Sequence, residues 1–548
     1  MSNQDYYIPE EPVAKAVVVR AVEYYGGGML SDINTAVYFV GEGMEQYLTI
    51  PDLVIVTEPD ELFGYERGIM VLGKTYDEWV AALGDEELEA LPDEPDYHVS
   101  ANFRNKGEDW EREVNIHYFE RGQLVWRQEV GIKNRGKAGS VGPTKCFNVY
   151  AREEYDGNSR MLFFFENGRV PDTVSLKNRN TILHDGLIIG LLEDRAIAPL
   201  HYQPVNFWVE GEYWGLYNLT EKYNRQFFQD YYNVKKDSVV IHKYDGFVAE
   251  TEEKEQCASE EWDLIYDFVA EHDLALQENY EVVCSMIDLD SFIDYYCAQI
   301  FIDSQDCSED YNVMQWKSAE IDKNNPYMDG KWRWILYDIN ATLREVDKDN
   351  LNCEIREGRP AFGEHKLLKA LLNNAEFEQR FINTMMDLMN KNFRSDYVSP
   401  QLKELADEIT VSEVLHNKRF YGDDNYLNVF SKEVDAIDDF FRERPVYVAD
   451  MLQERFDLGE PVTIEISSGN AGNSHIRLNS FEIDNSEGIW QGNYFAEVPI
   501  SLSAMESDNR MFLKWLITED GEMREITDQS IVIYPKTGMK IKALYQGK

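Results

Sequence analysis

Near Glu221 the hydrophobic pattern of this chain changes from short alternating runs to helical periodicity. Before that point, residues 97–170 alternate apolar and polar side chains, a pattern typical of antiparallel strands. After it, residues 288–303 place large apolar side chains four positions apart, which predicts a helix with a core-facing stripe. Helical patterns resume between about 364 and 455, and residues 461–548 return to short strands. The sequence therefore predicts an α+β fold in which a β-rich lobe precedes a helical lobe, with small β-sandwich-like appendages.

Local patterns place finer elements before residue 221. Strand-like runs on both sides of Gly26-Gly-Gly28 predict the edge of a β-sandwich within residues 13–50. Residues 181–197 carry leucine and isoleucine on one helical face and predict a helix. Two aromatic runs within 205–217 flank the turn Glu210-Gly-Glu212 and predict a hairpin.

Charge and cysteine content narrow the classes of function. The 548 residues include 101 Asp and Glu against 53 Lys and Arg, a net charge of −48. Such a surface repels phosphate backbones and anionic lipid heads, so we expect no nucleic acid partner. No apolar stretch approaches the roughly 20 residues that cross a bilayer, so we expect no membrane span. The six cysteines form no Cys-x-x-Cys pair, which argues against a zinc site and favours buried free thiols.

Metal-capable side chains fall on two predicted loops. Asp306 and Asn312 follow the 288–303 helix, and Asp338 ends the apolar run that starts at Trp334. Phosphoryl transfer uses one carboxylate to orient the attacking hydroxyl, and an amide plus a second carboxylate to hold magnesium across the phosphates. Magnesium prefers hard oxygen ligands and few protein contacts. The pattern therefore predicts phosphoryl transfer, although Asp and Asn are also ordinary turn residues.

Several motifs follow one another in a fixed order along the chain. They are Val130-Gly-Ile-Lys-Asn-Arg135-Gly136, Gly142-Pro-Thr-Lys145-Cys-Phe147, Gly211-Glu-Tyr-Trp-Gly-Leu-Tyr-Asn-Leu-Thr-Glu221, Ile300-Phe-Ile-Asp-Ser-Gln-Asp306 and Lys331-Trp-Arg-Trp-Ile-Leu-Tyr-Asp338-Ile-Asn340. Over residues 51–450 the chain resembles the CotH family of atypical protein kinases, first known from bacterial spore coats. The resemblance implies a bilobal kinase-like fold and transfer of phosphate from ATP to Ser or Thr hydroxyls of a protein.

The resemblance also implies roles on the nucleotide side of the site. Lys145 takes the position of the lysine that holds the ATP phosphates and serves catalysis, and Arg135 is a second cation near it. Glu221 ends the family's hairpin signature and is expected beside the nucleotide. Asp185 matches an acidic position of the family's helix, and its pairing with Lys145 is left open. The chain departs from the family at Ser140, where an arginine is usual.

In the part of the site where the phosphoryl group is transferred, the resemblance implies that Asp306 is the catalytic residue. Asn312 and Asp338 take metal-binding places for Mg²⁺ or Mn²⁺, and the preferred ion is left open. Asn340 stands where the family has a second aspartate, so it keeps an oxygen ligand but loses one negative charge. Ser304 replaces a family asparagine.

These features predict three domains and leave rival functions open. The first domain is an N-terminal β segment at 1–50, a remnant of a β-sandwich module. The second is a CotH kinase-like domain at 51–460, with an N-terminal lobe at 51–222 and a C-terminal lobe at 223–460. The third is a small β domain at 461–548. The departures keep open a pseudokinase scaffold that binds nucleotide without turnover. The last domain resembles modules of bacterial surface proteins, which predicts glycan contact as a further alternative. It also predicts a secreted or cell-surface protein with substrates there, although no signal peptide is visible, and a cytoplasmic location stays open.

Overall fold

The computed structural model describes most of the chain as two compact units. The first unit comprises Met1–Ile189, Leu200–Asn233 and Leu402–Asp435, and the second Gly190–Pro199, Val234–Gln401 and Ala436–Lys548. The described residues are 12–26, 29–31, 33–91, 98–163, 165, 168–179, 182–198, 200–309, 311–356, 358–422, 425–469, 475–483, 488–506 and 510–547. Both units combine distant parts of the sequence. Mixed helices and sheets confirm the α+β class.

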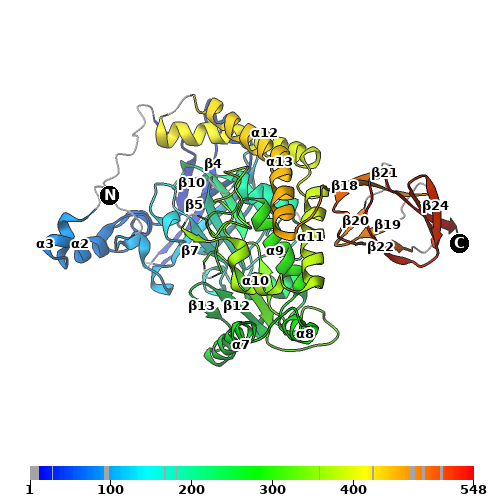
Figure 1. Ribbon diagram of the computed structural model, residues 1–548. Helices are drawn as coiled ribbons and strands as arrows, with labels where there is room; N and C mark the ends of the chain where they lie inside the picture. Colours follow the sequence, from blue (N-terminus) through cyan, green and yellow to red (C-terminus); the bar gives the residue numbers. More distant parts are fainter. Residues whose placement is uncertain are drawn as a thin grey trace. The chain divides into compact units, whose positions relative to one another are not determined.

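The first unit is built around a closed β-barrel (Figure 1). Around the barrel the strands are β10 (Tyr202–Val209), β11 (Glu212–Glu221), β9 (Thr173–Asn178), β8 (Phe147–Tyr150), β7 (Gln123–Asn134), β6 (Arg112–Glu120) and β5 (Asp52–Val56). Neighbouring strands are antiparallel, except that β5 pairs with β10 in parallel and closes the barrel. The antiparallel strands predicted within 97–170 and the hairpin predicted within 205–217 are confirmed.

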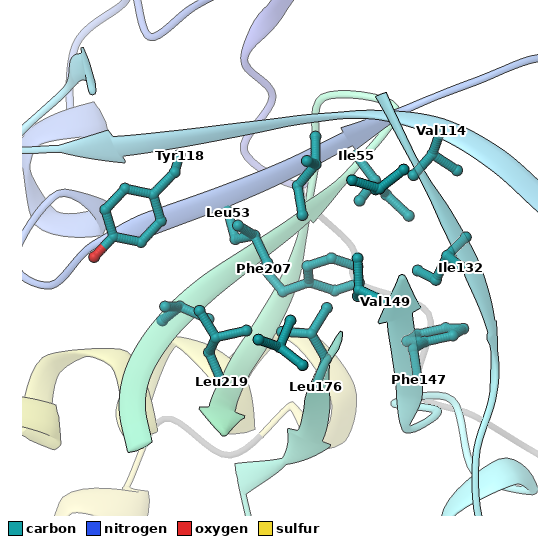
Figure 2. Packing of buried hydrophobic residues seen from close by; sticks show 14 of the residues in the cluster. Leu53, Ile55, Val114, Tyr118, Ile132, Phe147, Val149, Leu176, Phe207 and Leu219 are labelled. Carbon is teal, nitrogen blue, oxygen red and sulfur yellow. The ribbon is translucent and has the colours of Figure 1, made fainter. Parts of the chain in front are cut away.

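Aliphatic and aromatic side chains fill the barrel. Figure 2 shows residues from all seven strands, among them Leu53, Phe147, Leu176 and Phe207, converging on one interior. These four side chains are fully buried, and burying each is worth about 1.5–3 kcal/mol relative to exposure. The barrel therefore gives β9 and β11, which carry two of the residues discussed below, a rigid support.

Two glycines explain the hairpin motif at 211–221. Gly211 forms the turn with φ of 81°, and Gly215 adopts φ of 102°, a region that favours glycine. At Gly215 a methyl group would lie 2.5 Å from Nδ1 of His416. The same Nδ1 accepts a hydrogen bond of 3.0 Å from the Leu216 N–H. Close packing of β11 against a helix therefore requires glycine here.

Short elements complete the first unit. The paired strands β1 (Val17–Ala21) and β4 (Asn34–Tyr38), and β2 (Tyr24–Gly26) and β3 (Met29–Leu30), form two small sheets. Residues 27 and 28 of the predicted glycine turn lie outside the described residues. The short helices are α1 (Pro59–Phe63), α2 (Gly73–Ala81), α3 (Asp85–Glu89), α4 (Glu153–Asp156) and α6 (Arg225–Tyr232), whereas α5 (Leu187–Leu191) is divided between the two units.

The helix predicted over 181–197 is too long. A π-helical turn covers Ile182–Gly186, and α5 ends at Leu191. The residues that follow have hydrogen-bond partners elsewhere in the second unit: Arg195 donates to the side chain of Asn392 at 2.9 Å, and the Ala196 N–H donates to Asp294 at 2.9 Å. The Ala196 N–H thus bonds to a distant side chain instead of a carbonyl one turn earlier, so the helix does not continue.

The helical part of the second unit contains a four-stranded sheet, on which α7 and α9 pack. The strand order is β13 (Gly246–Val248), β12 (Val239–Lys243), β14 (Met314–Ser318) and β15 (Arg333–Ile335). The helices are α7 (Glu252–Glu271), α8 (Gln277–Met286), α9 (Leu289–Phe301), α10 (Lys366–Leu371) and α11 (Ala375–Asn390). The helices α12 (Ser395–Tyr421) and α13 (Tyr426–Phe456) are divided between the two units. Helix α9, buried from Ser291 to Phe301, confirms the helix predicted at 288–303.

The end of the second unit consists of two β-sheets (Figure 1). One has the order β21 (Ile489–Tyr494), β18 (Val462–Ser468), β26 (Lys540–Gly547), β23 (Arg510–Glu519) and β24 (Glu522–Ile526), and the other β20 (Phe481–Ile483), β19 (His475–Leu478), β22 (Ile500–Met505) and β25 (Ser530–Ile533). The buried Asp387 of α11 accepts hydrogen bonds from Ser480 and Tyr494. Across the described ranges, no helix combines the length and apolar character needed to cross a membrane.

Candidate functional site

The loops that carry Asp306 and Asp338 lie side by side in the second unit. The Asp306 loop precedes β14 and the Asp338 loop follows β15, and these two strands pair antiparallel. Their loop ends therefore lie at the same edge of the sheet. A backbone hydrogen bond of 2.9 Å from the Gln305 N–H to the Ala341 carbonyl joins the two loops.

Two side chains hold the Asp306 carboxylate. Its Oδ2 accepts a hydrogen bond of 2.9 Å from Nδ2 of Asn312, and its Oδ1 accepts one of 2.7 Å from Nη1 of Arg359. The Asn312 amide nitrogen also donates to the Asp306 backbone carbonyl at 2.8 Å. Asp306 is still 39% exposed, so a substrate hydroxyl can reach it. Because its nitrogen faces Asp306, Asn312 has its carbonyl oxygen available as a ligand.

Two of the predicted metal ligands have a left-handed backbone. Asn312 has φ of 53° and Asp338 has φ of 52°. This region is sparsely populated by residues other than glycine, and Asn and Asp tolerate it best. Such conformations cluster at ligand-binding and catalytic sites, where surrounding structure maintains them. Both loops therefore hold a candidate ligand in a conformation that Asn and Asp adopt more readily than other side chains.

The oxygen donors present here fit a magnesium-type ion. Within the described part of the chain, no group of three His, Cys, Asp or Glu side chains could hold a metal. A cation at this edge would therefore depend on one carboxylate, Asp338, and on the amide oxygens of Asn312 and Asn340. Mg²⁺ completes its octahedral shell largely with water and substrate phosphates, so this small set of hard donors suits it.

Lys145, in the first unit, lies buried beneath the loop that precedes it. Its Nζ donates to the backbone carbonyls of Ser140, Val141 and Gly142 at 2.9, 3.1 and 3.1 Å. The ammonium also lies 4.1 Å from the ring centre of Phe103. Burial lowers the pKa of Lys145 to about 7, whereas the three carbonyls favour its charged form. Lys145 therefore fixes the shape of a glycine-containing loop.

A second lysine, Lys177 on β9, is the partner of Asp185. Its Nζ lies 2.7 Å from Oδ2 of Asp185, and the two side chains are only 11% and 2% exposed. In ordinary kinases a strand lysine paired with a helix carboxylate contacts the α- and β-phosphates. Sequence reasoning missed Lys177 because it lies outside the conspicuous motifs. The signal that could have found it is a lysine in a buried strand eight residues before an acidic helical position.

Glu221, at the end of β11, lies within a hydrogen-bonded cluster. Its Oε2 accepts bonds from the Tyr231 hydroxyl at 2.6 Å and from the His201 N–H at 2.9 Å. The side chain is 4% exposed and borders a small pocket that includes Lys222 and Asn224. Of Arg135, the structure gives a backbone hydrogen bond of 2.9 Å to the Cys146 carbonyl.

The predicted site residues thus fall into two sets. Lys145, Arg135, Asp185 and Glu221, together with Lys177, belong to the first unit, whereas Asp306, Asn312, Asp338 and Asn340 belong to the second. The described structure brings together Asp185 with Lys177, and Asp306 with Asn312 and Arg359.

Comparison with known families identifies the class of protein. Residues 166–448, just over half of the 548, match the CotH kinase protein family. The chain therefore belongs to the CotH kinase family, and it is a kinase or kinase-like protein. The match includes Lys177 and both loops of the second unit, whereas Lys145 and Arg135 precede it. No curated protein matches the chain.

Proposed function

We propose that this chain is an ATP-dependent kinase that phosphorylates Ser or Thr hydroxyls of a protein, and that its two units correspond to the lobes of a kinase. The observation that carries the proposal is the adjacency of the Asp306 and Asp338 loops within a CotH-family chain. A secreted or cell-surface substrate is part of the proposal, because the sequence of residues 461–548 resembles that of modules of bacterial surface proteins.

In this reaction Asp306 orients the acceptor hydroxyl and takes its proton. The bond between the γ-phosphorus and the bridging oxygen of ATP breaks, and its electron pair stays on ADP. A new bond forms between phosphorus and the acceptor oxygen. Asn312 keeps the Asp306 carboxylate oriented. A divalent cation such as Mg²⁺ or Mn²⁺ neutralises phosphate charge when bound, and Asp338, Asn312 and Asn340 would hold it.

The proposal assigns the main phosphate contact to Lys177. Its ion pair with Asp185 fixes the ammonium while leaving further N–H groups for phosphate oxygens. Lys145 has three carbonyl acceptors already, so its contribution is to shape the loop over residues 140–142.

Lys177→Met and Lys145→Met are expected to differ in what they damage. Lys177→Met loses a charge-assisted phosphate bond worth about 1.5–3 kcal/mol, so kcat/KM for ATP falls roughly 10- to 150-fold. Both variants lower the thermal midpoint, because Lys145→Met removes the donor of three loop carbonyls and Lys177→Met leaves the buried Asp185 carboxylate without its cation. Only Lys177→Met is expected to lower kcat/KM for ATP. ATP kinetics and thermal unfolding of both variants check this. If Lys145→Met lost activity but kept its thermal midpoint, Lys145 and not Lys177 would be the main contact to the ATP phosphates.

Transfer of radiolabelled phosphate from ATP to a generic protein acceptor or to the chain itself, with Mg²⁺ or Mn²⁺, tests the proposed function. Wild type is expected to incorporate label, and Asp338→Ala to lose at least about 100-fold, because electrostatic stabilisation of transferring phosphate is a leading catalytic term. Asp322→Ala, an exposed aspartate of the same unit, serves as the control. Equal incorporation by wild type and Asp338→Ala would refute the assignment.

A pseudokinase is the second candidate. Asn340 reduces the negative charge available to a metal, and Ser140 and Ser304 replace an arginine and an asparagine typical of the family. Thermal stabilisation by ATP with Mg²⁺, without any incorporation of label, would select this alternative.

A further inference from the structure

A small hairpin places two arginines against the Asp306 loop. Strands β16 (Ile355–Arg356) and β17 (Arg359–Pro360) pair so that Arg356 lies opposite Arg359. Like charges directly opposite each other are destabilising. Both guanidinium groups nevertheless reach one loop: Arg359 contacts the Asp306 carboxylate at 2.7 Å, and Nη2 of Arg356 donates to the Cys307 carbonyl at 2.7 Å. The chain carries a net charge of −48, so two adjacent cations here require an explanation.

Arg356 is buried, and its hydrogen-bonding capacity is only partly used. Its side chain is fully buried, and its Nε and Nη1 have no hydrogen-bond partner among the described residues. Its guanidinium stacks over Phe362, with 4.4 Å to the ring centre. Burial, and to a lesser extent the nearby Arg359 charge, lower its pKa. Buried N–H groups without partners cost free energy, and the bond to the Cys307 carbonyl offsets only part of that cost.

Arg359 differs from Arg356 in being accessible. Its side chain is 34% exposed and lies over the ring of Tyr311 at 4.8 Å. A guanidinium has five N–H donors in a planar fork that suits the oxygens of a phosphoryl group. One of these donors contacts Asp306. The remaining edge can bind an oxyanion while Asp306 stays within hydrogen-bond distance.

The neighbouring carboxylate decides which anion fits. Asp306 is the residue that takes the proton of the acceptor hydroxyl in the proposed function, so the reacting phosphorus must come close to it. We propose that Arg359, positioned by the buried Arg356, binds the transferred phosphoryl group beside Asp306. This inference rests on the proposed function. In the transfer, Arg359 neutralises charge on the phosphoryl oxygens and makes or breaks no covalent bond.

Kinetics of Arg359 variants test the inference. Arg359→Gln is expected to raise KM for ATP about 10-fold, because a phosphate contact of the bound state is lost, and to lower kcat roughly 100- to 1,000-fold, because charge on the transferring phosphoryl group is no longer neutralised. Arg359→Lys keeps the charge and recovers part of kcat. The matched control is Arg380→Gln, since Arg380 is 35% exposed and pairs with Asp290 at 2.6 Å in the same unit. An unchanged or increased kcat in Arg359→Gln would overturn the inference. An increase would mean that the ion pair between Arg359 and Asp306 inhibits the enzyme.

Anion binding gives a readout that does not depend on turnover. Titration of the full chain with tripolyphosphate in the absence of divalent cations should show binding that Arg359→Gln weakens at least about 10-fold, the size of a lost charge-assisted bond. Arg380→Gln should bind like wild type. If wild type transfers no phosphate but tripolyphosphate binding depends on Arg359, the anion site stands and the kinase proposal fails. If wild type transfers phosphate and Arg359→Gln behaves like wild type in both assays, the inference alone fails.

Discussion

Asp306→Asn is expected to lower kcat for phosphoryl transfer roughly 10²- to 10⁴-fold, the usual contribution of a positioned general base. The amide keeps the shape of the side chain and can still accept one hydrogen bond, from Asn312 or Arg359. It has no negative charge to attract the hydroxyl proton. KM for ATP should stay within about threefold of wild type, because the lost interaction acts only in the transition state. Steady-state kinetics with ATP varied at a fixed acceptor concentration measure both constants.

The control for Asp306→Asn comes from another ion pair in the same unit. Asp290 pairs with Arg380 at 2.6 Å, as Asp306 pairs with Arg359 at 2.7 Å. Asp290→Asn removes the same charge from an exposed position, 78% accessible, and should leave kcat unchanged. A fall of kcat in both variants would point to a general effect of charge on the unit. No fall in either would mean that Asp306 does not act as the base.

The sequence predicts those parts of the fold that depend on nearby residues. Helix α9 follows from four-residue spacing of its core side chains, and the β10–β11 hairpin follows from its turn at Glu210–Glu212. In each case the interactions that decide the structure lie within a short stretch of chain.

Contacts between distant segments could not be predicted in this way. The parallel pairing of β5 with β10 joins residues more than 150 positions apart, and alternation of side chains is the same in an open or a closed sheet. Arg359 lies 53 positions from Asp306, in a hairpin with no distinguishing motif. Lys177 escaped notice for another reason, since it precedes Asp185 by only eight residues but lies outside the conspicuous motifs.

The substitution at Ser140 shows how a distant residue changes the meaning of a motif. Where the family usually has arginine, Ser140 donates through Oγ to the Lys137 carbonyl at 2.8 Å. Nη1 of Arg104 lies 3.3 Å from the same Oγ and 2.8 Å from the same carbonyl. A guanidinium is therefore present beside this loop although position 140 lacks one. The presence of serine at position 140 therefore does not mean that the loop lacks a nearby positive charge, because Arg104 provides one.

Arg444 of α13 connects the end of α9 to the loop that follows Asp338. It is fully buried, and burial lowers its pKa to about 10. Its guanidinium donates five hydrogen bonds, four of them to backbone carbonyls. The acceptors are Phe301 and Ile300 at 2.9 Å each, Val346 at 2.9 Å, Lys348 at 2.8 Å and the side chain of Asn350 at 3.4 Å. One side chain thus satisfies carbonyls of both segments near the candidate site.

Arg444→Met is therefore expected to destabilise the protein by about 4 kcal/mol, because several buried carbonyls lose their donor. The thermal midpoint should fall by roughly 10 °C for a unit of this size. Arg442→Met, two residues earlier on the same helix, breaks only exposed contacts to Asp438 and Asp439 and should leave the stability unchanged. Thermal and denaturant unfolding compare the two variants. Equal stability would mean that the Arg444 hydrogen bonds do not hold these segments together.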